Sequence, residues 1–200
     1  SYADKLGVPF AVDTDVNAAC LGEANFGDSK GLGTVVYITV GTGIGVGMCT
    51  SGKPYHGNRH PEAGHMRACR VPGDDMAGVC PYHPECIESL ASGPALHRRF
   101  GRDPSTVPVD HPGWDVEASY LSQLVCACLL MYSPDRVVMG GGVMEQGHLF
   151  QKIRDLSLEH LNGYLGYGSL DDVVVPASLN GDQGILGSAV LAMGIRGLKR

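Results

Sequence analysis

Four side chains that bind soft or borderline metal ions lie close together near the middle of the sequence. Three of them follow the pattern Cys80-x-x-His83-x-x-Cys86, with two residues between successive ligands. The fourth, His65, lies further upstream. A tight loop with this spacing can wrap a single ion, and two thiolates with two imidazoles form a tetrahedral set that zinc prefers. Four protein ligands leave no position for water, so the pattern predicts a structural zinc site and not a catalytic one.

Other residues in the same part of the chain can also bind a metal ion, but their spacing fits less well. Cys69 can replace one of the four ligands. The remaining alternatives are three histidines, His56, His60 and His111. Since none of them shares the regular spacing of the Cys-x-x-His-x-x-Cys pattern, the prediction remains the four-residue set.

A carboxylate lies directly beside the predicted metal ligands. Glu62 opens the run Glu62-Ala-Gly-His65, three residues before the upstream histidine. An ion bound to that histidine would make the surrounding loop rigid. A rigid carboxylate of this kind is suited to hold the hydroxyl groups of a small polar substrate.

A second candidate carboxylate, Asp15, lies between a short buried strand predicted at residues 8–12 and a helix predicted at residues 16–26, with Asn17 alongside. Open α/β sheets bind ligands at the carboxyl ends of their strands. A carboxylate there can accept a proton from a substrate hydroxyl as it attacks phosphorus. Asp15 can equally serve only as the N-cap of the helix. Asp13 is the rival base, but strand alternation favours Asp15 as the exposed one.

Two glycine-rich turns, Gly41-Thr-Gly-Ile-Gly45 and Gly140-Gly-Gly-Val-Met144, each follow a hydrophobic strand. Glycine lets backbone N–H groups approach phosphate oxygens, and Thr42 adds a hydroxyl donor. The second turn precedes a predicted helix, whose N-terminus would favour an anion. Neither turn is a Walker sequence or a dinucleotide fingerprint. The turns therefore predict phosphate binding, with a role in the fold alone as the alternative.

Strands and helices alternate along the sequence. The predicted strands span residues 8–12, 34–40, 46–49, 136–139 and 173–175, and the predicted helices span residues 16–26, 87–100, 114–132, 148–161 and 183–194. The strand at 46–49 returns as a hairpin, so we expect an α/β fold with a mixed sheet flanked by helices. The helix at 87–100 is expected to break at Gly93-Pro94. Residues 51–78 lack periodicity and predict an irregular excursion, which a metal ion would stabilise.

Composition narrows the function classes. The chain has 200 residues, of which 44% are hydrophobic, so it can bury a substantial core. The net charge is −6 and the basic residues are scattered, which argues against nucleic acid or an anionic membrane as a partner. No apolar run approaches the roughly 20 residues that a membrane span needs. Seven cysteines, an odd number with two in the metal-like pattern, favour a reducing cytoplasm over a disulfide scaffold.

Taken together, the motifs resemble those of the ROK family of sugar kinases and related repressors, in particular its bacterial fructokinases. The Cys-x-x-His-x-x-Cys form, in place of the Cys-x-Cys-Gly form of many ROK glucokinases and repressors, favours the fructokinase branch. The matching runs extend in the family's order over almost the whole chain: Asp13-Thr-Asp-Val-Asn-Ala-Ala19, Ile38-Thr-Val-Gly-Thr-Gly-Ile-Gly-Val-Gly47, His60-Pro-Glu-Ala-Gly-His65, Cys80-Pro-Tyr-His-Pro-Glu-Cys86, Ala91-Ser-Gly-Pro-Ala95 and Val138-Met-Gly-Gly-Gly-Val-Met144.

The resemblance implies an actin-like ATPase fold of the ribonuclease-H type that binds Mg²⁺·ATP and a hexose between two lobes. It implies ATP-dependent phosphorylation of a hexose, most simply fructose to fructose 6-phosphate, by a cytoplasmic homodimer. Asp15 would be the catalytic base, Asn17, Glu62 and His65 would contact the sugar, and His65 would also bind the structural zinc. The nucleotide contacts implied by the family are Thr42, Pro94, Gly140, Gly141, Gly142, Val143 and Met144.

One family feature is missing from the sequence. The amino-terminal lobe of ROK kinases opens with an Asp-x-Gly-Gly-Thr phosphate loop, and this run does not occur here. The chain therefore resembles the carboxy-terminal two-thirds of a longer enzyme. We expect residues 1–30 to form the end of the amino-terminal lobe with the catalytic Asp segment, and residues 31–200 to form the carboxy-terminal lobe with the zinc loop at 62–86. Such a fragment is expected to be weakly active or inactive alone.

The alternative function is a ROK-type sugar-sensing regulator that binds hexose without phosphorylating it. Such relatives carry a helix-turn-helix before the region that this chain covers. The presence of Asp15 and of both glycine-rich turns favours the kinase.

Overall fold

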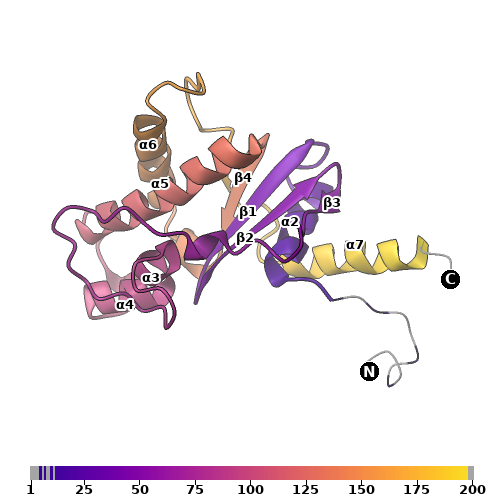
Figure 1. The fold of residues 1–200 in the computed structure, drawn as a ribbon, viewed down its shortest axis with the longest axis horizontal. Helices are drawn as coiled ribbons and strands as arrows, with labels where there is room; N and C mark the ends of the chain where they lie inside the picture. Colours follow the sequence, from indigo (N-terminus) through magenta and orange to yellow (C-terminus); the bar gives the residue numbers. More distant parts are fainter. Residues whose placement is uncertain (1–4, 6, 8–9, 11, 198–200) are drawn as a thin grey trace.

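The computed structural model describes the backbone of residues 5, 7, 10 and 12–197, and the side chains of these residues up to position 194. Within them, a sheet with the strand order β3-β2-β1-β4-β5 forms the centre (Figure 1). The strands are β1 Thr34–Val40, β2 Ile44–Thr50, β3 Lys53–Pro54, β4 Arg136–Gly140 and β5 Val174–Pro176. β2 pairs antiparallel with β1 and β3, whereas β4 pairs parallel with β1 and β5. The predicted mixed sheet is thus confirmed.

β1 is buried on both faces, which explains its run of β-branched residues. Successive side chains of a strand point to opposite faces. Accordingly, Val36 and Ile38 belong to the larger apolar core, while Val35 and Tyr37 belong to a smaller core on the other side. A strand covered on both faces reads as a continuous apolar run in the sequence.

Helices cover both faces of the sheet (Figure 1). α2 Asp15–Phe26 and α7 Gln183–Gly197 pack with the smaller core. The larger core lies against α3 Ile87–Ala91, α4 Gly93–Phe100, α5 Gly113–Tyr132 and α6 Leu149–Leu161. α2 and α7 approach closely, because a Cβ at Gly187 would lie only 1.6 Å from the carbonyl oxygen of Ala18. None of the described helices has the length and apolar character that crossing a membrane requires.

The helix predictions hold at most boundaries. The predicted break at Gly93 separates α3 from α4, and α5 begins one residue before the predicted helix. α5 buries an apolar stripe that runs from Trp114 through Leu121 to Cys128. This helix therefore contributes many of the buried side chains of the larger core.

The N-cap of α2 was predicted wrongly. Thr14 caps this helix, because its Oγ1 accepts the backbone N–H of Asn17 at 3.2 Å. Asp15 is already the first helical residue, and its carboxylate accepts the N–H of Val16 at 2.8 Å. Thr14 has the extended backbone that an N-cap requires (φ −74°, ψ 151°). The strand predicted at 8–12 falls largely on residues 8, 9 and 11, which lie outside the described residues.

The second glycine turn leads into a short helix before α6. η3, a 3₁₀ helix at Gly142–Glu145, follows the turn, and α6 begins only at Leu149. Gly141 has φ +94°, and a Cβ at this position would lie 2.4 Å from the carbonyl oxygen of Val40. The turn therefore reverses the chain tightly against β1, and the N-terminus of α6 lies beyond it.

The segment after β2 is irregular, as predicted, and contains only β3 and the 3₁₀ helix η1 Ala63–His65 before α3. A second short 3₁₀ helix, η2 Pro104–Thr106, follows α4. A nearly buried ion pair holds the irregular segment to the helices: Arg99 donates to Asp74 at 2.6 Å, and the hydroxyl of Tyr120 donates to the same carboxylate at 2.6 Å. Burial raises the pKa of Asp74, but the hydrogen bonds from Arg99 and Tyr120 outweigh it, so the pKa lies below its ordinary value.

Candidate functional site

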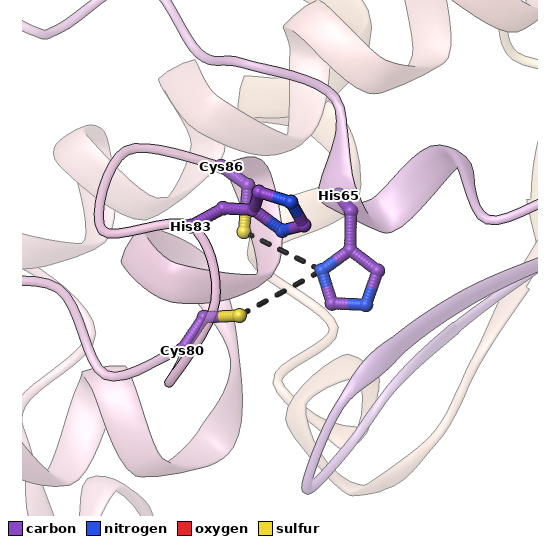
Figure 2. A group of neighbouring side chains, drawn as sticks. All are labelled: His65, Cys80, His83 and Cys86. Atoms are coloured by element: carbon purple, nitrogen blue, oxygen red, sulfur yellow. Dashed lines mark hydrogen bonds between the residues drawn. The ribbon is translucent and has the colours of Figure 1, made fainter.

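The four predicted metal ligands converge in the structure. The ligand atoms of His65, Cys80, His83 and Cys86 all lie within 4.8 Å of one another. The Nδ1 atom of His65 is 3.7 Å from the sulfur of Cys80 and 3.7 Å from that of Cys86. Figure 2 shows the imidazole of His65 facing the three side chains of the loop. Cys69 is exposed and is not part of this group. We call these four residues the Cys/His cluster.

The donor set of the Cys/His cluster fits a zinc ion. Cys80 and Cys86 are buried, whereas His83 is exposed. Burial is the largest effect on the thiol of Cys86 and raises its pKa to about 11. A bound divalent cation would reverse this effect, because a coordinating thiol is deprotonated. Two sulfur and two nitrogen donors match the tetrahedral shell of structural zinc sites.

Backbone hydrogen bonds bring the two halves of the Cys/His cluster together. The N–H of Ala68 donates to the carbonyl of Glu85, and the N–H of Ile87 donates to the carbonyl of Met66, each at 2.9 Å. The sulfur of Cys86 also caps α3. The segment after His65 therefore lies beside the end of the cysteine loop, which the sequence spacing alone does not require.

The Glu62–His65 run forms one turn of 3₁₀ helix against β2. The N–H of His65 donates to the carbonyl of Glu62 at 3.0 Å. A Cβ at Gly64 would lie 1.9 Å from the carbonyl oxygen of Ile44, so only glycine fits between the turn and the strand. Glu62 is exposed. The turn thus holds Glu62 and His65 at the same edge of the sheet.

Asp15 lines a cavity that does not include the Cys/His cluster. Its cavity, of about 210 Å³, is also lined by Thr39 at the end of β1, Gly141 of the second glycine turn and Gln183 at the start of α7. Neither Glu62 nor His65 is among the described residues that line it. Asp15 is exposed at the first turn of α2. The structure therefore brings Asp15 next to the second glycine turn.

Asn17, the other predicted substrate residue of this segment, is fully buried. Its side-chain N–H donates to Asp13 at 2.8 Å. The side-chain oxygen of Asn17 is buried without a hydrogen-bond partner among the described atoms. Asn17 thus fixes the carboxylate of Asp13 and has one unused acceptor.

The two glycine-rich turns meet although they are far apart in the sequence. β1 and β4 are parallel neighbours in which Thr39 is paired with Gly140, so the turns that follow them lie at the same edge. A cavity of about 360 Å³ lies between the turns and α4, where Gly93 donates its N–H to the carbonyl of Gly41 at 2.7 Å. Of the predicted nucleotide residues, this cavity is lined by Thr42, Gly142 and Val143.

A second cavity, of about 420 Å³, lies on the other side of the Gly140–Met144 turn. It contains the remaining predicted residues of this turn, Gly140, Gly141 and Met144, and extends to Gln183. Pro94 follows Gly93 in the first turn of α4, next to the 360 Å³ cavity. The Gly140–Met144 turn therefore separates two cavities and lines both.

Comparison with known proteins decides the family. The model of the ROK family matches residues 1–195. The chain belongs to the ROK family. A fructokinase from Pediococcus pentosaceus is 40% identical over 188 residues, covering 94% of this chain and 65% of its own length. A fructokinase from Zymomonas mobilis is 38% identical over 195 residues, covering 96% of this chain and 65% of its own length. The chain thus spans about 65% of these relatives.

A solved ROK structure confirms the predicted fold class. The ROK hexokinase from Thermus thermophilus superposes with a TM-score of 0.79 at 26% identity, covering 98% of this chain and 69% of that chain. The mixed sheet with helices on both faces is therefore the actin-like fold of ROK sugar kinases.

Within this ROK chain, Glu88 is a residue of the site that the sequence analysis missed. One of its carboxylate oxygens accepts the N–H of Ile44 at 2.9 Å, and the other lies 3.8 Å from Nδ1 of His65. A Cβ at Gly43 would lie 2.7 Å from the first oxygen, so the glycine turn must approach the carboxylate closely. Glu88 thus connects the first glycine turn with the Cys/His cluster. Its position two residues after Cys86, at the start of α3, was the available signal.

Proposed function

We propose that this ROK chain takes part in the ATP-dependent phosphorylation of a hexose, with fructose as the substrate and fructose 6-phosphate as the product. The observation that carries the proposal is the cavity shared by the carboxylate of Asp15 and the glycine turn at Gly141. A base and a phosphate-binding turn in one cavity are the parts that phosphoryl transfer needs. The similarity to fructokinases from two bacteria supports fructose as the substrate.

Asp15 acts as the base in this proposal. It accepts the proton of a sugar hydroxyl while the hydroxyl oxygen bonds to the γ-phosphorus and the bond from that phosphorus to ADP breaks. Since the transition state is loose, orientation of the hydroxyl also contributes to the rate. The exposure of Asp15 at the first turn of α2 leaves its carboxylate accessible to a substrate.

Glu62 and His65 hold the sugar in this proposal, whereas Asn17, which is fully buried, supports the site by fixing the carboxylate of Asp13. The Nδ1 atom of His65 faces both thiols, so its Nε2 atom carries the proton when Nδ1 binds an ion. An Nε2–H group can donate to a sugar hydroxyl, and the carboxylate of Glu62 can accept from another. Structural zinc in the Cys/His cluster would fix the ring of His65 in the required orientation.

The nucleotide lies against the two glycine turns in this proposal. Thr42 and Pro94 line one side, and the Gly140–Met144 turn supplies backbone N–H donors on the other. The Mg²⁺ ion that accompanies ATP would neutralise phosphate charge. The left-handed backbone of Gly141 supports this role, because it lets the turn pack directly against β1.

We extend the proposal to the organisation of the protein. Residues 1–30 supply the end of an amino-terminal lobe with the catalytic aspartate, and residues 31–200 form the carboxy-terminal lobe with the zinc loop at 62–86. The protein acts as a homodimer in the cytoplasm. The two thiols of the Cys/His cluster support a reducing compartment, because only reduced cysteines bind zinc.

A coupled assay of ADP release tests the function, carried out with fructose, ATP and a full-length protein that includes the amino-terminal lobe. Asp15→Asn is expected to lower turnover by roughly 10²–10⁴-fold, the usual scale for a positioned base. Fructose binding, measured by calorimetry, should change little. The matched control is Asp115→Asn, an exposed aspartate in the first turn of α5, which should keep full turnover.

Three outcomes contradict parts of the proposal. Normal turnover of Asp15→Asn excludes this residue as the base. Fructose binding without turnover in the unmodified full-length protein favours a sugar-sensing regulator. No fructose binding at all overturns the proposed substrate.

A further inference from the structure

A second group of metal-binding side chains lies apart from the Cys/His cluster. The ligand atoms of Asp13, His56 and His60 all lie within 4.8 Å of one another. The Nε2 atom of His56 is 2.8 Å from one carboxylate oxygen of Asp13, and the Nδ1 atom of His60 is 3.9 Å from the other. The two imidazole rings meet edge to face, with their centroids 5.1 Å apart. Two separate segments of the chain supply these residues.

The carboxylate of Asp13 is held in place before any ion binds. Its Oδ1 atom accepts the backbone N–H of Thr14 and the side-chain N–H of Asn17, each at 2.8 Å. Its side chain is only 6% exposed, whereas those of His56 and His60 are 43% and 42% exposed. The group therefore combines a fixed acidic ligand with two imidazoles that an ion can reach from solvent.

The hydrogen bond between His56 and Asp13 explains the position of His56 but not that of His60. The 2.8 Å contact of His56 is a normal hydrogen bond, but the 3.9 Å separation of His60 from the same carboxylate is too long for one. Ligands bound to one tetrahedral zinc ion lie about 3.4 Å apart, given bond lengths of about 2.1 Å. The two observed separations lie on either side of this value. Rotation of the two rings, which are partly exposed, is the movement that would bring all three ligands to one ion.

We propose that Asp13, His56 and His60 form a second metal site, which binds a divalent transition-metal ion such as zinc, cobalt or nickel. Two imidazoles and a carboxylate suit these borderline ions and not Mg²⁺, which prefers oxygen ligands. Three protein ligands leave at least one coordination position open to water or another small ligand. The site therefore differs from the Cys/His cluster, whose four ligands close the shell.

An ion in the second site would connect two segments that carry residues of the proposed kinase site. Asp13 lies two residues before Asp15, and His60 lies two residues before Glu62. An ion bound by Asp13 and His60 ties the segment of the proposed base to the segment of the proposed sugar contact. The inference concerns metal binding itself, so its test does not depend on the proposed kinase reaction.

Cobalt(II) titration of the metal-free protein tests the proposal, because the two sites give different spectra. Cobalt bound by thiolates has a strong sulfur-to-metal charge-transfer band, and cobalt bound only by nitrogen and oxygen lacks it. We expect two equivalents of tightly bound cobalt, of which only one produces this band. The double variant His56→Ala/His60→Ala should lose the equivalent without the band and keep the other. Retention of the charge-transfer band also shows that the variant has folded.

Single variants sharpen the result. His60→Ala should weaken the second equivalent by at least about tenfold, on the scale seen when a metal site loses a supporting group. The matched control His160→Ala removes an exposed histidine from the end of α6 and should leave both equivalents unchanged. One bound equivalent in the unmodified protein overturns the proposal. A second equivalent that binds equally well to His56→Ala/His60→Ala is an adventitious ion, and this result overturns it too.

Discussion

The β1–β2 hairpin and the loop from Cys80 to Cys86 meet at the candidate sugar site, but different forces hold them. The hairpin has seven paired positions and is largely buried in the apolar cores. The loop has few backbone hydrogen bonds and carries the exposed His83. The hairpin therefore keeps its shape through its own backbone and core. The loop carries three of the four side chains of the Cys/His cluster, so we expect its shape to depend on the proposed ion.

The largest expected effect is confined to residues 62–86, the segment that carries the Cys/His cluster. Removing the proposed zinc, by a chelator or by Cys80→Ser, takes away apparent binding energy on the order of 10 kcal/mol. Amide hydrogen exchange should become faster across residues 62–86 and stay slow across residues 34–50. The fructose KM should rise, because Glu62 and His65 lie on the released segment.

Cys69→Ser is the matched control for that experiment, since Cys69 is an exposed thiol outside the Cys/His cluster. It should keep the metal content and the exchange pattern of the unmodified protein. Equal exchange of residues 62–86 with and without metal would contradict the comparison, as would metal analysis that finds no zinc in the unmodified protein.

The next effect is on the hairpin, and it should spread to the whole protein. Ile38→Ala removes a fully buried side chain of β1 and should lower the free energy of unfolding by about 2–5 kcal/mol. Denaturant titration followed by fluorescence and by metal release should give coincident transitions. Val109→Ala, at a largely exposed position, should have almost no effect. A loss confined to the loop would show that the core does not connect the two regions.

A smaller effect is expected at the Glu62–His65 turn, which packs against β2 and carries His65 of the Cys/His cluster. Gly64→Ala places a methyl group against the carbonyl of Ile44 and should cost about 1–3 kcal/mol, the usual scale of overpacking. The fructose KM should rise while the zinc content stays constant. Gly168→Ala is the control, because a Cβ there meets no atom within 4 Å. An unchanged KM for Gly64→Ala would separate the turn from sugar binding.

The smallest expected effect depends on pH. The pKa of Asp74 lies below its ordinary value of 3.8 in the folded protein. Its contribution to stability is therefore complete above pH 3.8 and decreases as the pH falls toward the folded pKa. Asp74→Asn should be destabilised near neutral pH, and the difference from the unmodified protein should shrink at a pH below 3.8.

Denaturant titrations at the two pH values measure this difference. The exposed Asp110→Asn is the control and should show little destabilisation at either pH. A gap between Asp74→Asn and the unmodified protein that widens in acid would contradict the assigned role of the ion pair with Arg99.

Much of this architecture was predictable from local sequence. The β-branched run of β1 and the apolar stripe of α5 gave their elements to within a residue. The Cys-x-x-His-x-x-Cys spacing predicted the loop, because side chains with only two residues between them must lie close. The cap of α2 was missed, since Thr14 and Asp15 are both good capping residues and only the backbone conformation distinguishes them.

Other parts of the site depend on contacts between distant segments. Glu88 is an ordinary helical glutamate in the sequence, and only the packing of α3 against β2 brings it to Ile44 and His65. The ion pair of Asp74 with Arg99 likewise joins an irregular segment to α4. Periodicity and spacing carry no information about such pairs, because they arise when the core closes.

The sequence by itself determined most of the described elements, the residues of the Cys/His cluster and the two glycine turns, because short-range spacing and propensity are local properties of the chain. The tertiary structure decided which of these features share a cavity. The parallel pairing of β1 with β4 brought the glycine turns together. The approach of residues 53–60 to the start of α2 placed His56 and His60 around Asp13. These contacts between distant segments depend on burial and on strand register, and both are properties of the assembled core.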